Sequence, residues 1–293
     1  MQLEIPRKLN ALVEQAHLVA TEVFRPISRK YDRHEHEYPV ELDMLASVMD
    51  GMNEGDLGGG AGAAKLKRES TEKGGAVRNG ANMATVLGLT ELCWGDVGLA
   101  LTIPRQGLGN AAIAAVANEE QARRFKGRWA AMAITEPGAG SDSANIRTTA
   151  VLDGDHYVLN GEKIFGTAGA RADFIVVWAT LDPSAGRAAI KSFVVEKGTP
   201  GCVLVRLDHK LGIRASDTAT IQLSDCRVPK ENLLGSPIVD TKQGFGGVMQ
   251  TFDNTRPVVA AMAVGVGRAS LERTRELLRK RGILGGYERA LYG

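Results

Sequence analysis

The sequence predicts an α+β protein, with an N-terminal all-α domain, a central antiparallel β-barrel domain and a truncated C-terminal helical bundle. Two changes of periodicity carry this prediction. Apolar residues recur at helical spacing before residue 130, alternate with polar residues between 148 and 223, and return to helical spacing from Pro257. We expect domains at 1–130, 131–240 and 241–293, because 293 residues suffice for two or three domains of ordinary size.

The first 130 residues are expected to be largely helical. Apolar side chains keep helical spacing from Leu9 to Phe24, just before Pro26, where we expect the helix to end. The same pattern returns at 42–49, 86–97 and 110–125. The glycine-rich stretch 51–65 is expected to be a surface loop, since no Lys-Ser/Thr pair follows its glycines as a phosphate-binding loop requires.

The period changes to that of strands after residue 147. Segments 148–152 and 156–159 alternate polar and apolar residues around Asp153-Gly154-Asp155, which is a hairpin signal. Further β-rich runs follow at 175–178, 193–195, 203–205 and 220–223. Because no helix-length segment separates these runs, they favour an antiparallel barrel or sandwich of about 100 residues.

The last predicted helix is apolar on every side. Residues 258–266 offer no polar face, and a helix of this kind is normally surrounded by other helices. Residues 282–293 are too few to form a bundle around it. Its neighbours must therefore come from the first domain, from another subunit, or from sequence absent here.

Composition and charge exclude several classes of protein. Lys+Arg minus Asp+Glu is 36 − 34 = +2, which gives no electrostatic case for nucleic acid. The cysteines form no CxxC pair, and the histidines show no metal-ligand spacing, so no metal is expected. His34 and His36 lie in a charged segment and are expected to be solvated. With no signal peptide and no membrane span in view, we expect a cytoplasmic protein.

Residues 133–142 (AITEPGAGSD) form the most informative stretch of the chain. Its small residues let backbone N–H groups lie against a flat, anionic ligand, and Thr135 and Ser141 add hydroxyl donors. Taken alone, the run from Glu136 to Asp142 is equally consistent with a turn that leads into a strand.

Four further segments follow in order. They are 160–169 (NGEKIFGTAG), 211–218 (LGIRASDT), 228–235 (VPKENLLG) and 252–260 (FDNTRPVVA). Together with 133–142, this series resembles the signature segments of the acyl-CoA dehydrogenases. The resemblance implies FAD as cofactor, an acyl-CoA substrate, a homo- or hetero-oligomer of such subunits, and an electron-transfer flavoprotein as electron acceptor.

Roles in flavin binding are implied by the resemblance for Met132, Ile134, Thr135, Gly140, Ser141, Phe165, Thr167 and Arg281. Thr135 would hydrogen-bond the pyrimidine edge of the ring, Thr167 would hydrogen-bond N5, and Phe165 would pack on the ring. Taken alone, Phe165 is more readily explained as a core residue. Arg281 would reach the FAD diphosphate across a dimer, but a basic helix end explains it equally well.

Roles on the substrate side are implied for Ser141, Asp253, Thr255 and Arg256. Asp253 and Arg256 are also explained as a cap and a surface charge at a helix start. The catalytic base of the family is not recognisable, because the place that carries it in some relatives is Thr255, whose hydroxyl has no useful pKa for proton abstraction.

Two functions therefore stay open. In the first, the chain is an acyl-CoA dehydrogenase subunit whose base comes from elsewhere. In the second, it is a non-catalytic FAD-binding or assembly subunit. A third alternative keeps the fold and changes the chemistry, as in acyl-CoA oxidases and flavin monooxygenases.

Overall fold

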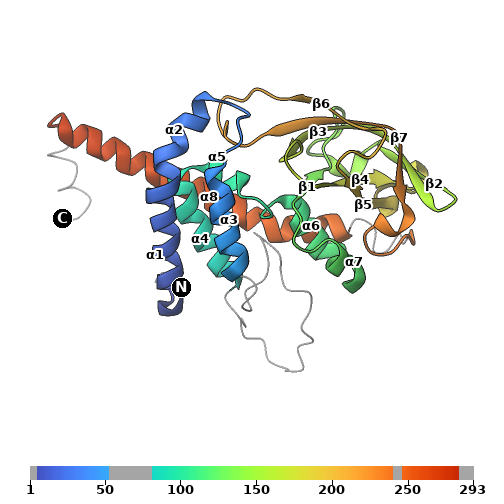
Figure 1. Ribbon diagram of the computed structural model, residues 1–293, viewed down its shortest axis with the longest axis horizontal. Coiled ribbons are helices and arrows are strands. Elements are labelled where there is room, and N and C mark those ends of the chain that lie inside the picture. Colours follow the sequence, from blue (N-terminus) through green and yellow to red (C-terminus); the bar gives the residue numbers. More distant parts are fainter. Residues whose placement is uncertain (1–4, 53–80, 240–245, 284–293) are drawn as a thin grey trace.

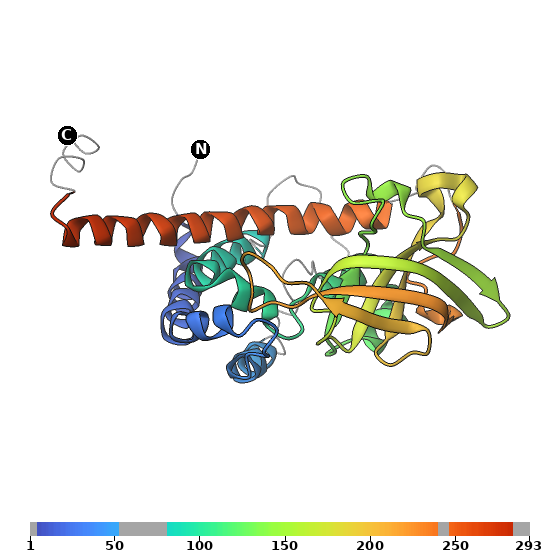
Figure 2. The same ribbon diagram turned by 90° about the horizontal axis from the view of Figure 1, so that it is seen from above.

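A computed structural model describes residues 5–52, 81–239 and 246–283 (Figure 1). A group of helices stands beside a curled β-sheet, and one long helix runs along both (Figure 2). The helices before the sheet are α1 (Asn10–Val19), α2 (Arg25–Arg33), α3 (Glu41–Met52), α4 (Ala81–Gly95), α5 (Val97–Thr102), α6 (Leu108–Val116) and α7 (Glu119–Arg124). The predicted succession of helical, β and helical segments is confirmed, while the domain boundaries stay predictions.

The first helix passes Pro26 instead of ending before it. Between α1 and α2 the chain forms a π-helical turn, Ala20–Phe24, in which the Arg25 N–H donates to the Ala20 carbonyl five residues earlier. Pro26 then lies at the start of α2, where a missing N–H costs little. The predicted end at Pro26 is therefore wrong, because a wider turn accommodates the proline.

The loop predicted at 51–65 does not start at residue 51, since residues 51 and 52 belong to α3. The rest of this predicted loop lies outside the described residues.

In the described parts of the chain, seven strands form the sheet. They are β1 (Ala130–Ala133), β2 (Thr149–Asp153), β3 (His156–Thr167), β4 (Phe174–Thr180), β5 (Ile190–Glu196), β6 (Cys202–Leu207) and β7 (Thr218–Pro229). Their order is β1-β4-β2-β3-β7-β6, and β5 pairs with β4. The predicted hairpin is confirmed, with Asp153 opposite His156 and Gly154 at φ +62° in the turn.

The sheet is not antiparallel throughout. β1 runs parallel to β4, and β2 meets β4 in a parallel bridge between Thr149 and Thr180. The β2–β3 hairpin separates β1 from β4 in sequence, and so long a connection allows parallel pairing. The local alternation of residues predicted the strands but carried no information on this pairing.

Among the residues that the structure describes, three apolar clusters hold the fold together. One fills the curl of the sheet and includes Leu159, Phe193 and Ile221. A second joins the outer face of the sheet to α6 and contains both Met132 and Ile134. The third lies among the helices and includes Phe24, Tyr31 and Leu42. The second cluster matters for function, because it fixes the strand that leads into 133–142.

The long helix α8 spans Gly246–Lys280, so it begins well before Pro257. It packs against α4, where a Cβ on Gly265 would lie 2.3 Å from the Thr90 carbonyl oxygen. The opposite side leaves Val259, Val264 and Leu271 more than half exposed. The helix start predicted at Pro257 is wrong, because packing of the preceding turns on the second cluster extends the helix in spite of the proline.

None of the helices in the described part of the chain combines the length and the apolar character that a bilayer crossing requires.

Candidate functional site

The structure brings together the two segments for which flavin-binding roles were predicted. The Ile164 N–H donates to the Thr135 carbonyl oxygen at 2.9 Å. A Cβ on Gly166 would lie 3.9 Å from the Met132 carbonyl oxygen, and a Cβ on Gly140 would lie 3.9 Å from the Thr135 methyl group. Segment 132–140 therefore crosses β3 just before Thr167. Both threonine side chains are half-buried, so they stay accessible.

The backbone of β3 is strained at this crossing. Its pairing with β7 shifts register between Lys163 and Gly166. Phe165 and Ala168 adopt positive φ angles of 61° and 63°, which residues other than glycine rarely adopt. Phe165 is 62% exposed, so its interpretation as a core residue is wrong. Strain of this kind persists where the surrounding structure enforces it, and it clusters at functional sites.

A buried ion pair fixes segment 133–142 on β3. The Lys163 ammonium, fully buried, donates to Glu136 Oε1 at 2.7 Å and to the Ile134 carbonyl oxygen at 3.1 Å. Glu136 also accepts from the Arg147 N–H at 2.6 Å and the Thr148 N–H at 2.9 Å. Burial lowers the pKa of Lys163 to about 8. Burial alone would raise the pKa of Glu136, but Lys163 brings it below its usual value. Glu136 is therefore a structural residue in this chain.

A second buried pair holds the turn after Thr167. Asp217 accepts from the Ala168 N–H with its backbone carbonyl at 3.2 Å and from the Ala170 N–H with Oδ2 at 2.8 Å. Arg171 Nε lies 3.6 Å from Asp217 Oδ1, and Arg171 Nη2 donates to the Glu37 carbonyl oxygen at 3.0 Å. Arg171 thus links this turn to the connection between α2 and α3. Asp217 therefore holds the backbone of this turn in place.

Three of the four residues predicted for the substrate side, Asp253, Thr255 and Arg256, lie near the start of α8, whereas Ser141 lies in segment 133–142 and is exposed. Phe252 packs against the cluster that contains Met132 and Ile134, which places this part of α8 beside the strand that leads to Thr135. Asp253 and Arg256 are exposed and form an ion pair of 3.4 Å with each other. Thr255 is 4% exposed, and its hydroxyl faces the Phe252 carbonyl at 3.4 Å.

Arg281 lies far from the other predicted flavin residues. It follows the last turn of α8, 28 residues beyond Asp253, or about 42 Å at 1.5 Å per helical residue. Figure 2 shows the end of α8 on the side away from the sheet. A role at the flavin is therefore possible for Arg281 only in a neighbouring subunit.

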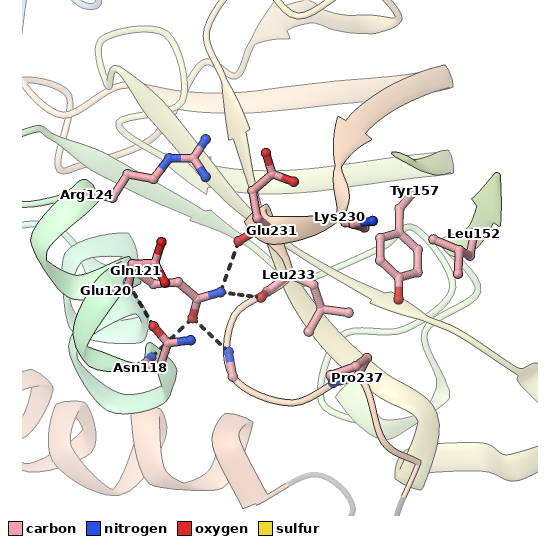
Figure 3. A pocket seen from close by; sticks show the side chains of 11 residues that line it. Asn118, Glu120, Gln121, Arg124, Leu152, Tyr157, Lys230, Glu231, Leu233 and Pro237 are labelled. Carbon is pink, nitrogen blue, oxygen red and sulfur yellow. Dashed lines mark hydrogen bonds between the residues drawn. The ribbon is translucent and has the colours of Figure 1, made fainter. Parts of the chain in front are cut away.

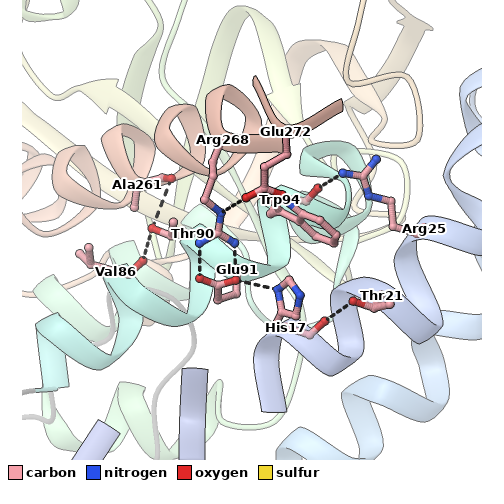
Figure 4. A network of polar contacts seen from close by, with 10 residues as sticks. All are labelled: His17, Thr21, Arg25, Val86, Thr90, Glu91, Trp94, Ala261, Arg268 and Glu272. Atoms are coloured by element: carbon pink, nitrogen blue, oxygen red, sulfur yellow. Dashed lines mark hydrogen bonds and ion pairs between the residues drawn. The ribbon is translucent and has the colours of Figure 1, made fainter. Parts of the chain in front are cut away.

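A polar network anchors α8 to the N-terminal helices (Figure 4). Arg268 on α8 binds both carboxylate oxygens of Glu91 on α4, with Nη1 at 2.6 Å from Oε1. The same carboxylate lies 2.9 Å from His17 Nδ1 on α1. Trp94 Nε1 donates to Glu272 at 2.6 Å. The spacing of these residues in the sequence gave no sign that they meet.

A cavity of about 390 Å³ lies between α7 and residues 230–237 (Figure 3). The Gln121 side chain donates to the carbonyls of Glu231 and Leu233 and accepts from the Gly235 N–H. These contacts use both ends of the amide to hold the backbone. None of the residues with a predicted flavin or substrate role lines this cavity.

One histidine differs clearly from its expected environment. His36 is not solvated, since both ring nitrogens are buried and lack a hydrogen-bond partner. Its ring lies 5.2 Å from that of His209, and both lie beside the Glu35 carboxylate. His34, by contrast, is mostly exposed as expected.

Comparison with known proteins places the chain in a class. Residues 131–226 match the model of the acyl-CoA dehydrogenase middle domain. The solved butyryl-CoA dehydrogenase of Megasphaera elsdenii is similar at a TM-score of 0.77 and 29% identity, with 94% of this chain and 70% of that chain covered. The chain thus has the acyl-CoA dehydrogenase fold.

Curated relatives agree with this class. The chain is 44% identical over 157 residues to cyclohex-1-ene-1-carbonyl-CoA dehydrogenase of Geobacter metallireducens, covering 53% of this chain and 40% of that protein. It is 31% identical over 282 residues to acryloyl-CoA reductase (NADH) of Anaerotignum propionicum, covering 93% of this chain and 66% of the relative. The chain belongs to the acyl-CoA dehydrogenase family, and it spans between 40% and 66% of the length of these two relatives.

Proposed function

We propose that the chain binds FAD and takes part in the α,β-dehydrogenation of an acyl-CoA thioester. The observation that carries this proposal is the crossing of 132–140 over β3, which places Thr135 beside the segment that ends in Thr167. Membership of the acyl-CoA dehydrogenase family supports it independently.

The residues at the crossing fit a flavin ring. Gly138 has open space where a Cβ would stand, and Gly140 has only the Thr135 methyl group nearby, so a planar ligand can approach this backbone. Thr135 and Thr167 would supply hydroxyl groups to the ring edge, and the exposed Phe165 would supply an apolar face.

When bound, FAD supplies the acceptor for the hydride from the β-carbon of the thioester. The part of this chain is to bind and orient. Met132 and Ile134 would line the ring edge, Gly140 and Ser141 would bind the diphosphate side, and Arg281 would bind a neighbour's diphosphate. Ser141, Asp253, Thr255 and Arg256 would face the acyl-CoA side. Since Arg256 is exposed, it can form charge-assisted hydrogen bonds with phosphate groups of CoA.

We propose that the base that removes the α-proton comes from outside this set of residues. Thr255 cannot serve, because it is buried and its hydroxyl does not ionise in the useful range. Asp253 is already paired with Arg256 at the surface. If neither another polypeptide nor further sequence of this protein supplies a base, the chain acts instead as a non-catalytic FAD-binding or assembly subunit.

We propose a homo- or hetero-oligomer with acyl-CoA dehydrogenase subunits in both alternatives. The outward side of α8 exposes Val259, Val264 and Leu271, and helices of a second acyl-CoA dehydrogenase-like subunit would cover such a surface. For the catalytic alternative, an electron-transfer flavoprotein is the proposed electron acceptor.

The proposal is tested by the flavin itself. We expect the chain, co-expressed with the product of its genomic neighbour, to be yellow and to contain FAD. Thr167→Val should shift the flavin absorption bands, because it removes the hydroxyl expected at N5, whereas Thr167→Ser should leave them in place. Colourless protein, or identical spectra for both variants, would contradict the site.

Bleaching of the flavin band by acyl-CoA under anaerobic conditions separates the two alternatives. A catalytic subunit loses the oxidised flavin band when a thioester of suitable chain length is added. A non-catalytic subunit keeps the band with every acyl-CoA tested.

A further inference from the structure

We propose that Glu35, His36 and His209 form a binding site for a divalent transition-metal ion, with Zn²⁺ as the best match. One ligand atom from each residue lies within 4.8 Å of the other two. Glu35 and His36 belong to the connection between α2 and α3, and His209 follows β6. This inference concerns a different part of the molecule from the proposed flavin site and does not depend on it.

The ligand set and spacing suit zinc. Two imidazoles and one carboxylate are a common protein set for Zn²⁺, with bonds of about 2.0–2.2 Å. Ligand atoms on one tetrahedral ion then lie roughly 3–4 Å apart. The present separations of up to 4.8 Å therefore close with small side-chain rotations.

The ring nitrogens of His36 are free to bind a metal ion, because none of the described residues forms a hydrogen bond with them. Both of its ring nitrogens are buried and have no hydrogen-bond partner. A buried polar group without a partner is rare, because it loses its bonds to water without replacement. His36 adopts a positive φ of 71°, which directs the ring toward His209 at the cost of backbone strain.

A hydrogen bond from the backbone orients the Glu35 carboxylate. Its side chain is 6% exposed, and Oε1 accepts the Lys210 N–H at 2.8 Å. The other oxygen, Oε2, lies 2.9 Å from His209 Nδ1. A hydrogen bond from backbone to a ligating carboxylate is the kind of support that orients metal ligands.

Two cations lie near the cluster, and one of them, Arg214, limits its affinity for a metal ion. Arg214 Nη2 lies 3.4 Å from Glu35 Oε2 and competes with a metal for that oxygen. The Lys210 ammonium instead donates to the Ser216 carbonyl at 2.5 Å. Because the Arg214 side chain is about a third exposed, it can swing into solvent when the ion binds. Removing its charge should therefore tighten metal binding.

A metal at this place would connect the helices to the sheet. It would join the α2–α3 connection to the segment after β6, the same connection that Arg171 holds through the Glu37 carbonyl. The His209 side chain is 86% exposed, so water completes the coordination on the outer side. The expected consequence is structural, namely a higher melting temperature with the metal bound.

The test uses the untagged, metal-free full chain titrated with ZnCl₂ by calorimetry, and with Co²⁺ by absorption spectroscopy. We expect one ion per chain and a rise in melting temperature. His36→Ala and His209→Ala should each weaken binding by at least about tenfold, since a lost ligand costs no less than a lost supporting residue. His34→Ala is the matched control, because His34 is exposed, near in sequence and outside the cluster. Arg214→Gln should tighten binding.

The proposal is overturned if the wild-type chain does not bind Zn²⁺, or if His209→Ala binds it as tightly as the wild type. His209 is exposed, so its replacement does not endanger folding, and the test stands even if His36→Ala fails to fold. Cobalt spectra without the bands of a tetrahedral site containing histidine would overturn the proposed ligand set.

Discussion

The buried ion pair between Lys163 and Glu136 allows a quantitative prediction. Lys163→Met keeps the length of the side chain and removes its charge, leaving Glu136 with the backbone N–H groups of Arg147 and Thr148 and the Thr148 hydroxyl as donors. Removing one partner of a buried ion pair costs about 3–5 kcal/mol. Because three donors remain, we expect a loss near the lower limit, about 3 kcal/mol in the free energy of unfolding.

The assay is urea unfolding followed by tryptophan fluorescence, with Glu136→Gln and the double variant completing a thermodynamic cycle. Removing both charges should restore part of the loss, since no carboxylate is then left without its cation. We expect a coupling energy of about 1–3 kcal/mol between the two positions. Single losses that simply add in the double variant would refute the pair as the reason for the stability of 133–142.

The same pair predicts a dependence on pH. The folded pKa of Lys163 is about 8 and its ordinary value is 10.5, so between these values the unfolded chain binds more protons than the folded one. The free energy of unfolding of the wild type should therefore rise relative to Lys163→Met above pH 8, by about 1 kcal/mol between pH 7 and 9. A difference that stays constant or shrinks over this range would contradict the burial of the ammonium.

Two further predictions concern the attachment of α8 to α4. Gly265→Ala should lower the free energy of unfolding by about 1–3 kcal/mol in urea, because the new methyl group would meet the Thr90 carbonyl, whereas Gly267→Ala, with open space around it, should stabilise the helix by up to about 1 kcal/mol. Equal effects of the two changes would show that α8 does not pack closely on α4. Glu91→Gln should cost about 1 kcal/mol at pH 7, a value reduced because the partner Arg268 is about a third exposed. Burial alone would raise the pKa of Glu91, but Arg268 and His17 hold it below its usual value of 4.5, so the melting temperatures of wild type and variant should converge once the pH falls below this lowered pKa.

Much of the secondary structure was readable from periodicity. The β2–β3 hairpin follows directly from alternation around Gly154, and the strands after it were found where β-branched residues gather. Errors occurred at prolines. Pro26 and Pro257 both lie in continuous helical segments, because a π-helical turn absorbs the first and packing of the preceding turns offsets the second. Local rules treat a proline as an end, while tertiary contacts decide whether it is one.

The site was readable only in part. The signature residues around Thr135 and Thr167 were found from their order in the chain, and their roles stay predictions. The residues that hold these segments in place were missed, because Lys163 and Arg171 look like ordinary surface cations in a sequence. Their partners, Glu136 and Asp217, lie 27 and 46 residues away in the chain, and spacing of that kind carries no local signal.

The amino-acid sequence by itself determined the family, the succession of helices and strands, and the segments that a flavin would need. Each of these follows from short motifs and local periodicity, which are properties of residues close together in the sequence. Only the tertiary structure decided which cations are buried, which strands pair in parallel, and that Glu35 and His36 meet His209. Those outcomes depend on where distant segments are brought into contact, because burial and electrostatic interaction are set by distance in space and not by distance along the chain.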